Sequence, residues 1–322
     1  MNAIDWLLDA EPAIRWQTMR DLTEASPAAV AAERARVGLE GKGAEMLDLQ
    51  QSDGAWRCSG KPVWLSTLFT MLFLRATGID NTEPAVKSAM ARLEAGLRWN
   101  NQDDRWELRP PETGGNTFFE GEVEPCINGG VLALGAYFGR PTESLALRLV
   151  GEQLEDGGWN CEAPKSTRSS FHTTICVLEG LLEFERAVGR VPAVVAAIQR
   201  GEEYLLERRL FRRRSTGEIA NQAFLELAYP PRYHYDVLRA LDYFRNAAIQ
   251  NHAEPDDRLR DAVDLIRNRQ QEDGRLLLDR SYHEGLAFPF DESVGQPSRW
   301  NTLRALRVFR WYGEQGTTRR SR

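Results

Sequence analysis

The chain has 322 residues, of which 42% are hydrophobic and 27% charged, with a formal net charge of −6. These proportions are typical of a globular protein with a sizeable core, and the acidic balance argues against nucleic acid as a partner. No apolar run reaches the roughly 18–20 residues that a membrane span needs, and residues 1–6 lack the features of a secretory signal. Four cysteines in so long a chain do not form a disulfide framework, so we expect reduced thiols and a cytoplasmic protein.

Helical periodicity runs through the whole chain, whereas the alternation typical of strands is almost absent. A short N-terminal pair of helices is expected at 4–8 and 12–23, within a segment 1–26 that packs on the rest of the protein. Five further pairs follow, and the first member of each is amphipathic and has a proline at or near its start, where proline is tolerated. These first members are expected at 27–50, 83–98, 141–154, 192–209 and 255–271, with prolines Pro27, Pro84, Pro141, Pro192 and Pro255.

The second member of each pair is more apolar, so it should be buried on most of its faces. These members are expected at 63–77, 126–138, 171–188, 233–249 and 299–313. Alternating polar and apolar helices indicate two concentric layers. We therefore predict an all-α fold, an α/α toroid of about five to six helical hairpins whose parallel inner helices surround a central cavity. The toroid should span 27–316, followed by a disordered tail at 317–322.

A short repeat separates the hairpins. Its two full copies are Gln50–Trp56 and Gln153–Trp159, a third copy at 270–276 lacks the tryptophan, and a fourth at 100–106 lacks the glutamine and the glycine. The repeat resembles the QW motif of the squalene and oxidosqualene cyclases and the related repeat of protein prenyltransferase β subunits. That resemblance covers about 28–313 and implies the α/α toroid. It also implies a structural role for the glutamines and tryptophans, which tie neighbouring hairpins together.

The repeat also shows which residues occupy equivalent places at the starts of the inner helices. The aligned positions hold Trp64, Cys126, His172, His234 and Trp300. Parallel inner helices begin at one mouth of the toroid, so these side chains should converge there. Cysteine and histidine are ligands for zinc and similar transition metals, so we predict a metal site.

The comparison with prenyltransferases adds to this prediction. Their zinc site uses an Asp-x-Cys pair and a histidine, which Glu124-Pro125-Cys126 and the segment beginning Phe171-His172 resemble. The resemblance therefore implies Glu124, Cys126 and His172 as ligands of a zinc ion. His234 rests on the repeat alignment alone, and Asp236 is a further ligand or a partner that orients a histidine. The alternative is that Cys126 is a small buried residue and that both histidines form hydrogen bonds in the wall of the cavity.

Aromatic and basic residues near the same helix starts could line the cavity, although aromatic side chains also serve as ordinary core. The candidates for this lining are Trp64, Phe118, Phe119, Phe171, Arg232 and Trp300. Tyr233 and Tyr235 are candidate proton donors, and Asp236 is a candidate general base.

The sequence also departs from both families. It lacks the Asp-x-Asp-Asp acid motif of class II cyclases, and the stretch 114–123 is acidic and aromatic where prenyltransferases carry basic residues. We therefore expect a metal-dependent enzyme that acts on a hydrophobic or isoprenoid-like small molecule, as a transferase, cyclase or lyase. Two alternatives remain open: a non-catalytic toroid that binds an apolar ligand or peptide, and one subunit of a prenyltransferase-like complex.

Overall fold

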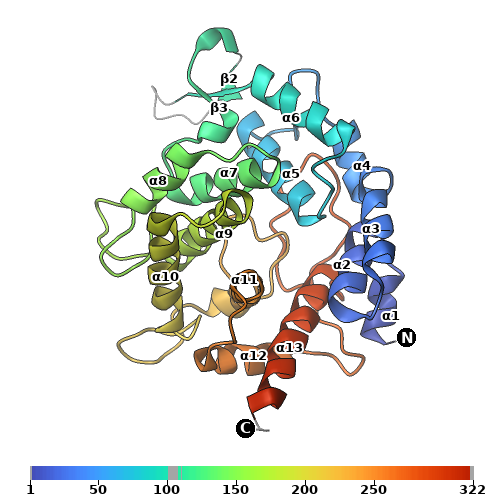
Figure 1. The fold of residues 1–322 in the computed structure, drawn as a ribbon, viewed down its shortest axis with the longest axis vertical. Helices are drawn as coiled ribbons and strands as arrows, with labels where there is room; N and C mark the ends of the chain where they lie inside the picture. Colours follow the sequence, from blue (N-terminus) through green and yellow to red (C-terminus); the bar gives the residue numbers. More distant parts are fainter. Residues whose placement is uncertain (1, 101–107, 110, 320–322) are drawn as a thin grey trace. The chain divides into compact units, whose positions relative to one another are not determined.

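The computed structural model describes residues 2–100, 108–109 and 111–319 of the chain (Figure 1). Nearly all the regular structure in these residues is helical, so the predicted all-α class is confirmed. The chain divides into two compact units, each assembled from segments that are distant in sequence. The first unit comprises Met1–Arg34, Leu205–Tyr282 and Asp291–Arg322, and the second comprises Ala35–Tyr204 and His283–Phe290.

The second unit is built around three apolar helices. These are α5 (Val63–Ala76), α7 (Pro125–Tyr137) and α9 (Phe171–Val188), and α7 packs between the other two. Their central turns are buried on nearly every face, as the apolar composition predicts.

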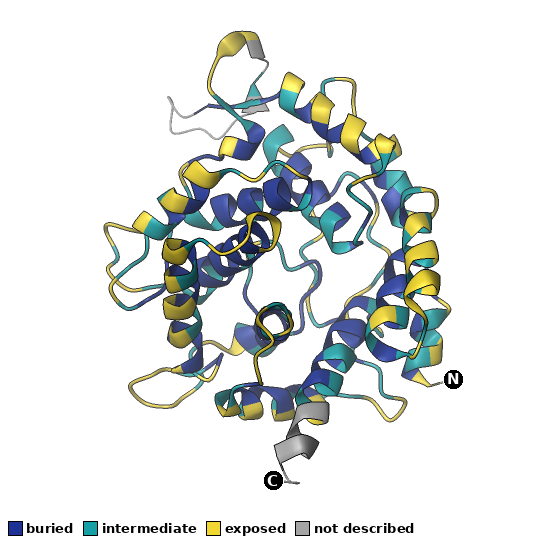
Figure 2. Ribbon diagram, in the orientation of Figure 1, coloured by how far each residue is buried: buried dark blue, intermediate teal, exposed yellow. Residues whose placement is uncertain are grey.

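More polar helices cover these three and keep one face exposed (Figure 2). They are α4 (Gly41–Asp48), α6 (Pro84–Gly96), α8 (Glu143–Gly151) and α10 (Pro192–Leu206). A proline is the first residue of α6 and α10 and also of α3 (Pro27–Ala35), where its missing N–H costs no hydrogen bond. Inner and outer helices therefore alternate along this unit, as the toroid predicts.

The first unit repeats this organisation with different helices. α13 (Arg299–Arg319) packs against α2 (Pro12–Leu22) and α11 (Val237–Asn251). α1 (Ala3–Leu8) lies on α2, and α12 (Arg260–Arg267) lies on α11 and α13. Short 3-10 turns are present at η4 (Gln222–Leu225) and η5 (Asp257–Leu259). In the described part of the chain, no helix is both long enough and apolar enough to cross a membrane.

Both full copies of the glutamine–tryptophan repeat make the same hydrogen bonds. The Gln50 amide donates to the carbonyl oxygens of Gly54 and, in α6, Ala89; the Gln153 amide donates to those of Gly157 and, in α10, Ala197. Both tryptophan rings donate from Nε1 to a backbone carbonyl at 2.6 Å. Each glutamine thus joins the turn of its own hairpin to the next outer helix. The fourth copy, at 100–106, lies almost entirely outside the described residues.

A second contact of the repeat joins the turn to the following inner helix. The backbone N–H of Trp159 donates to Thr174 Oγ1, and that of Trp56 donates to Thr67 Oγ1. The third copy has leucine in place of tryptophan, yet its Leu276 N–H still donates to Thr302 Oγ1. The residues just after each tryptophan position therefore cross the first turn of an inner helix.

The outer helix expected at 27–50 is not continuous. It is divided into α3, a 3-10 turn η1 (Arg36–Gly38) and α4. Gly41, the first residue of α4, has a φ of 66°, a left-handed conformation that glycine adopts without strain.

A small sheet that the sequence did not predict lies between α6 and α7. Its strands are β1 (Arg98–Trp99), β2 (Leu108–Arg109) and β3 (Asn116–Thr117), in the order β2-β1-β3 and antiparallel throughout. Strands of two residues are too short to produce a readable alternation. The 3-10 turns η2 (Pro111–Thr113) and η3 (Phe118–Glu120) complete this connection.

The end of the chain was expected to be a tail at 317–322. The backbone of α13 continues through 317–319, and 320–322 lie outside the described residues.

Candidate metal centre

Four of the five aligned positions occupy the same place in their helices. Trp64, Cys126, His172 and Trp300 are each the second residue of α5, α7, α9 and α13. In the second unit the alignment therefore puts the cysteine and the histidine on the first turns of two helices that pack together.

His234 does not share this position, and its predicted equivalence with Cys126 is wrong. α11 begins at Val237, four residues later than expected, and its second residue is Leu238. The reason is Asp236, whose side chain accepts a hydrogen bond from Arg239 N at 2.7 Å and so caps the helix. The His234 N–H bonds to the carbonyl of Pro231 in the turn before the cap.

Two glycines set the spacing between α7 and α9. A Cβ added to Gly129 would lie 2.3 Å from the carbonyl oxygen of Cys176, and one added to Gly180 would lie 2.4 Å from that of Gly129. Only glycine fits at such backbone contacts. Because the helices touch there, their first turns are also held close together.

A cluster of potential ligands lies at these first turns. The Cys126 sulfur is 3.8 Å from Glu124 Oε2, and the ligand atoms of Glu124, Cys126 and Cys161 all lie within 4.8 Å of one another. Cys161 follows Trp159 by two residues, on the connection that crosses the start of α9. The Thr173 hydroxyl donates to Cys161 Sγ at 3.5 Å and accepts from the Cys161 backbone N–H at 3.4 Å. One hydroxyl thus fixes this cysteine against α9.

The sulfurs of Cys126 and Cys161 lie within 4.8 Å of each other, so the ionisation of one thiol affects that of the other. The contact with Cys161, followed by burial, raises the pKa of Cys126 well above its usual range. The same contact lowers the pKa of Cys161 to about 7 against the effect of burial, with Thr173 contributing in the same direction. Cys161 is therefore the thiol of the pair that ionises first, and a zinc ligand must be a thiolate.

A second carboxyl group lies directly beside the cluster. Glu122 is only 1% exposed, and its oxygens accept the backbone N–H groups of Val123 and Glu124. The Asn128 side chain binds the backbone of Glu122 at two points. Its Oδ1 accepts from the Glu122 N–H, and its Nδ2 donates to the Glu122 carbonyl. Burial raises the pKa of Glu122 to about 7 in spite of these hydrogen bonds. A substantial fraction of this carboxyl is thus neutral near neutral pH, and it adds less negative charge to the site.

The donor set fits a zinc-like ion. Zinc binds thiolate at about 2.3 Å and carboxylate at about 2.0–2.2 Å, so tetrahedral ligands lie about 3.6–3.8 Å apart. The 3.8 Å between Cys126 Sγ and Glu124 Oε2 matches that spacing. Two sulfurs and one oxygen would leave a fourth position open.

Two of the predicted ligands belong to this cluster, and one member was missed. Glu124 and Cys126 are brought together, whereas His172 is not in the group; among the described residues the third member is Cys161. His172 precedes Thr173 on the first turn of α9, and its role as a ligand stays a prediction. The sequence did contain a signal for Cys161, since a residue that follows the repeat tryptophan crosses an inner-helix start. Cys58 occupies the same place after Trp56, and its sulfur contacts the Ser59 carbonyl.

Four of the other predicted site residues, Arg232, Tyr233, His234 and Tyr235, lie close together in the first unit. His234 lies between two tyrosine rings, with centroids 3.6 Å from Tyr282 and 4.4 Å from Tyr233. The Tyr235 hydroxyl donates to the carbonyl of Leu210, and its ring packs on Phe224. Arg232 lies in the preceding turn with a φ of 50°.

Two of the expected cavity aromatics are core residues. Phe118 stacks on Trp99 at 5.3 Å and contacts Phe119 edge to face, and both phenylalanines are at most 3% exposed. Trp300 is stacked on Tyr229 at 4.7 Å. The rings of Trp64 and Phe171 contact Trp99 and Tyr204, respectively.

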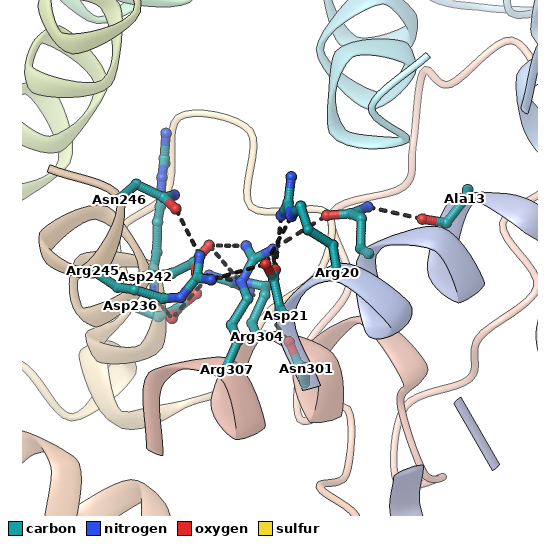
Figure 3. Close-up of polar contacts among 12 residues, drawn as sticks. Ala13, Arg20, Asp21, Asp236, Asp242, Arg245, Asn246, Asn301, Arg304 and Arg307 are labelled. Atoms are coloured by element: carbon teal, nitrogen blue, oxygen red, sulfur yellow. Dashed lines mark hydrogen bonds and ion pairs between the residues drawn. The ribbon is translucent and has the colours of Figure 1, made fainter. Parts of the chain in front are cut away.

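Asp236 belongs to a buried network of carboxylates and guanidinium groups on α2, α11 and α13 (Figure 3). Asp242 accepts two hydrogen bonds from Arg307, and Asp21 forms ion pairs with Arg245 at 3.0 Å and Arg307 at 3.7 Å. The further members are Asp236, Asn301 and Arg304. Arg245, Arg304 and Arg307 approach this group from α11 and α13, so the network joins the inner helices of the first unit.

Asp236 is the least well compensated acid of this network. It is 1% exposed, and its nearest charged partner is Arg304, with Nη2 3.9 Å from Oδ1. The other oxygen, Oδ2, is buried and has no partner that meets hydrogen-bond geometry, although the Ala228 amide lies near the carboxyl group. Burial raises the pKa of Asp236 more than these neighbours lower it. A neutral carboxyl in this position is a candidate proton donor.

No protein-family model and no curated protein matches the chain. Solved structures do resemble it. A protein from Actinoplanes is 16% identical, with 95% of this chain and 90% of that chain covered and a TM-score of 0.47. The apo form of the type II terpene cyclase MstE from Scytonema is 16% identical, with 92% and 86% covered and a TM-score of 0.44. A variant of that cyclase in complex with merosterolic acid A is 12% identical, with 88% and 97% covered and a TM-score of 0.27.

Proposed function

We propose that the chain is a metal-dependent enzyme whose zinc-like ion is bound by Glu124, Cys126 and Cys161. The observation that supports this proposal is the meeting of two thiols and a carboxylate from separate segments at one point. Such a donor set selects a thiophilic divalent ion, and three protein ligands with an open fourth position are the pattern of a catalytic zinc site.

The residues at this centre have different roles in binding the ion. Cys126 and Cys161 bind as thiolates, and Thr173 orients Cys161 through its hydroxyl. Glu124 supplies the third ligand from the residue that precedes α7. The buried Glu122 carboxyl accepts the backbone N–H groups of Val123 and Glu124 and so holds the segment that carries the third ligand. When bound, the ion supplies Lewis-acid activation of a water, thiol or carbonyl-type group at its open position.

The site can take two forms, which differ in whether His172 is a ligand of the ion. A site without this histidine keeps an open position, whereas a site that it completes has four protein ligands and is structural. We propose the open form, because His172 is outside the cluster of ligand atoms. For the substrate we propose the hydrophobic or isoprenoid-like class that the resemblance of the repeats implies.

Metal analysis of the purified protein tests this function. We expect about one equivalent of zinc per chain, lost in a Cys126→Ala/Cys161→Ala variant and kept in a His172→Ala variant. Cys58→Ala is the matched control, because Cys58 holds the place of Cys161 in another repeat. A content below about 0.2 equivalents in the unmutated protein, for zinc and every other transition metal, would refute the proposal. Native mass spectrometry of the same sample separates the alternative, since an apolar ligand that co-purifies without metal indicates a binding module.

A further inference from the structure

The two thiols of the cluster are suited to react with each other. Cys126 and Cys161 are free and only partly buried, and their sulfurs lie within 4.8 Å of each other. The other two cysteines differ from this pair. Cys176 is buried inside α9, and Cys58 contacts a backbone carbonyl. Among the described cysteines, only Cys126 and Cys161 combine partial exposure with membership of one cluster.

We propose that Cys126 and Cys161 form a reversible disulfide, which makes the first turns of α7 and α9 a redox-sensitive modification site. Formation of the disulfide depends only on the geometry of the two thiols. Its consequence, that oxidation prevents metal binding, rests on the proposed function. The reactant is a small-molecule disulfide of the glutathione type.

The backbone around the pair is already fixed, so only the side chains need to move. Gly129 lies one turn after Cys126, and its backbone packs directly against that of Cys176 in α9, so the two helices are in contact close to the pair. Thr173 holds Cys161 by its N–H and its sulfur. A disulfide bond needs the sulfurs at about 2.05 Å, so sulfurs that now lie within 4.8 Å would have to come closer by χ1 rotation at two partly exposed residues.

The exchange balances in two steps. The Cys161 thiolate attacks one sulfur of the small disulfide, the S–S bond breaks, and one small thiolate leaves. The Cys126 thiol then gives its proton to solvent and attacks Cys161 Sγ, which releases the second small thiolate. Two protein thiols are oxidised to one disulfide, and one small-molecule disulfide is reduced to two thiols. Both thiolate ligands of the proposed centre are consumed together.

Peptide mapping after equilibration with glutathione tests the inference. The full-length protein, treated with a chelator, is incubated at a series of ratios of oxidised to reduced glutathione, trapped with an alkylating agent and digested. We expect a peptide pair cross-linked through Cys126 and Cys161 that disappears as reduced glutathione increases. In Cys161→Ser the cross-link is lost and Cys126 carries glutathione instead, whereas Cys58→Ser keeps the cross-link. Separate glutathione adducts on Cys126 and Cys161 of the unmutated protein, with no cross-link at any ratio, would overturn the proposal.

The same experiment with zinc present separates this inference from the proposed function. If the cross-link forms without zinc and is suppressed by stoichiometric zinc, both proposals are supported. If the cross-link forms equally with zinc, the disulfide stands and the metal centre fails. If zinc binds but the metal-free protein never forms the cross-link, the metal centre stands and the disulfide fails.

Discussion

Two polar clusters lie on inner helices, one in each unit, and they differ in how their negative charges are balanced. In the first unit Asp21 and Asp242 contact the guanidinium groups of Arg245 and Arg307. In the second unit, by contrast, no described lysine or arginine forms an ion pair with Glu122 or Glu124, and Arg148 donates to the backbone carbonyls of Glu122 and Val123 rather than to a carboxylate of the cluster. The first cluster already contains its cations and therefore joins helices. The second presents thiols and carboxyl groups to which a cation can be added, and this contrast is why we assign the site there.

The ionisation of the acids follows the same division. Burial alone would raise the pKa of Asp242, but the charge of Arg307 and its hydrogen bonds lower it. For Glu122 burial prevails and its pKa rises to about 7. Asp236 is the exception in the first cluster, because the distance to Arg304 is too long to offset its burial.

The largest effect should come from removing a cation of the first cluster. Arg307→Met leaves Asp242 buried without its two hydrogen bonds, and we expect a loss of about 3–5 kcal/mol in the free energy of unfolding. Arg310→Met is the matched control on the same helix. Its ion pair with Glu24 is solvent-exposed, so the expected loss is about 0–1 kcal/mol. Equal losses for both variants in chemical denaturation would remove the distinction between a helix-joining network and a surface pair.

The second cluster should depend on the close approach of α7 and α9. Gly129→Ala places a methyl group against the carbonyl of Cys176, and we expect a loss of about 1–3 kcal/mol together with weaker zinc binding. Gly151→Ala, in α8, meets no atom within 4 Å and is expected to stabilise the protein by up to about 1 kcal/mol. Zinc titration and denaturation of both variants measure the effect. Unchanged zinc affinity in Gly129→Ala would show that the helix contact does not position the ligands.

Acid should weaken the first cluster over a defined range. Burial acts to raise the pKa of Asp21, but the hydrogen bond and charge of Arg20, with Arg245 and Arg307, lower it from 3.8 to about 2. A lowered folded-state pKa contributes stability above the unfolded value, and this stability is lost as the pH falls toward the folded value. We therefore expect Asp21 to contribute about 2 kcal/mol at neutral pH, a contribution lost between about pH 4 and pH 2. Free energies of unfolding against pH, for the protein and for Asp21→Asn, should converge across that range. Parallel curves would contradict the assignment.

The smallest expected loss of stability comes from the hairpin repeat. Substitutions at two adjacent residues, Gln50 and Gln51, compare a glutamine that joins two segments with one that does not. Gln50→Ala removes the hydrogen bonds to Gly54 and Ala89, so we expect a loss of about 1–2 kcal/mol. Gln51→Ala removes one exposed contact to Leu49 and should change stability by less than about 0.5 kcal/mol. Thermal or chemical denaturation of the two variants gives the comparison. A larger loss for Gln51→Ala would show that the repeat does not stabilise the fold in this way.

The helices could be predicted because their signals are local. Prolines begin α3, α6 and α10, and a run of apolar residues forms α5. The start of α11 was misplaced because one side chain, Asp236, caps the helix, and no periodicity shows which of several polar residues does so.

The candidate site could be predicted only in part because its members come from separate segments. Glu124 and Cys126 are close in sequence and were found together. Cys161 comes from the turn before another helix, and its contact with Cys126 depends on how tightly α7 packs on α9. The pairing of Asp242 with Arg307 likewise joins two helices that no motif connects.

X-ray absorption at the zinc edge tests the central claim most directly. The protein purified with zinc should show an ion with two sulfur ligands at about 2.3 Å and lighter ligands at about 2.0–2.2 Å. In Cys161→Ala the signal of one sulfur should disappear, while Cys58→Ala leaves the spectrum unchanged. An ion with a single sulfur ligand in the unmutated protein, or a spectrum that Cys161→Ala does not alter, would contradict the account.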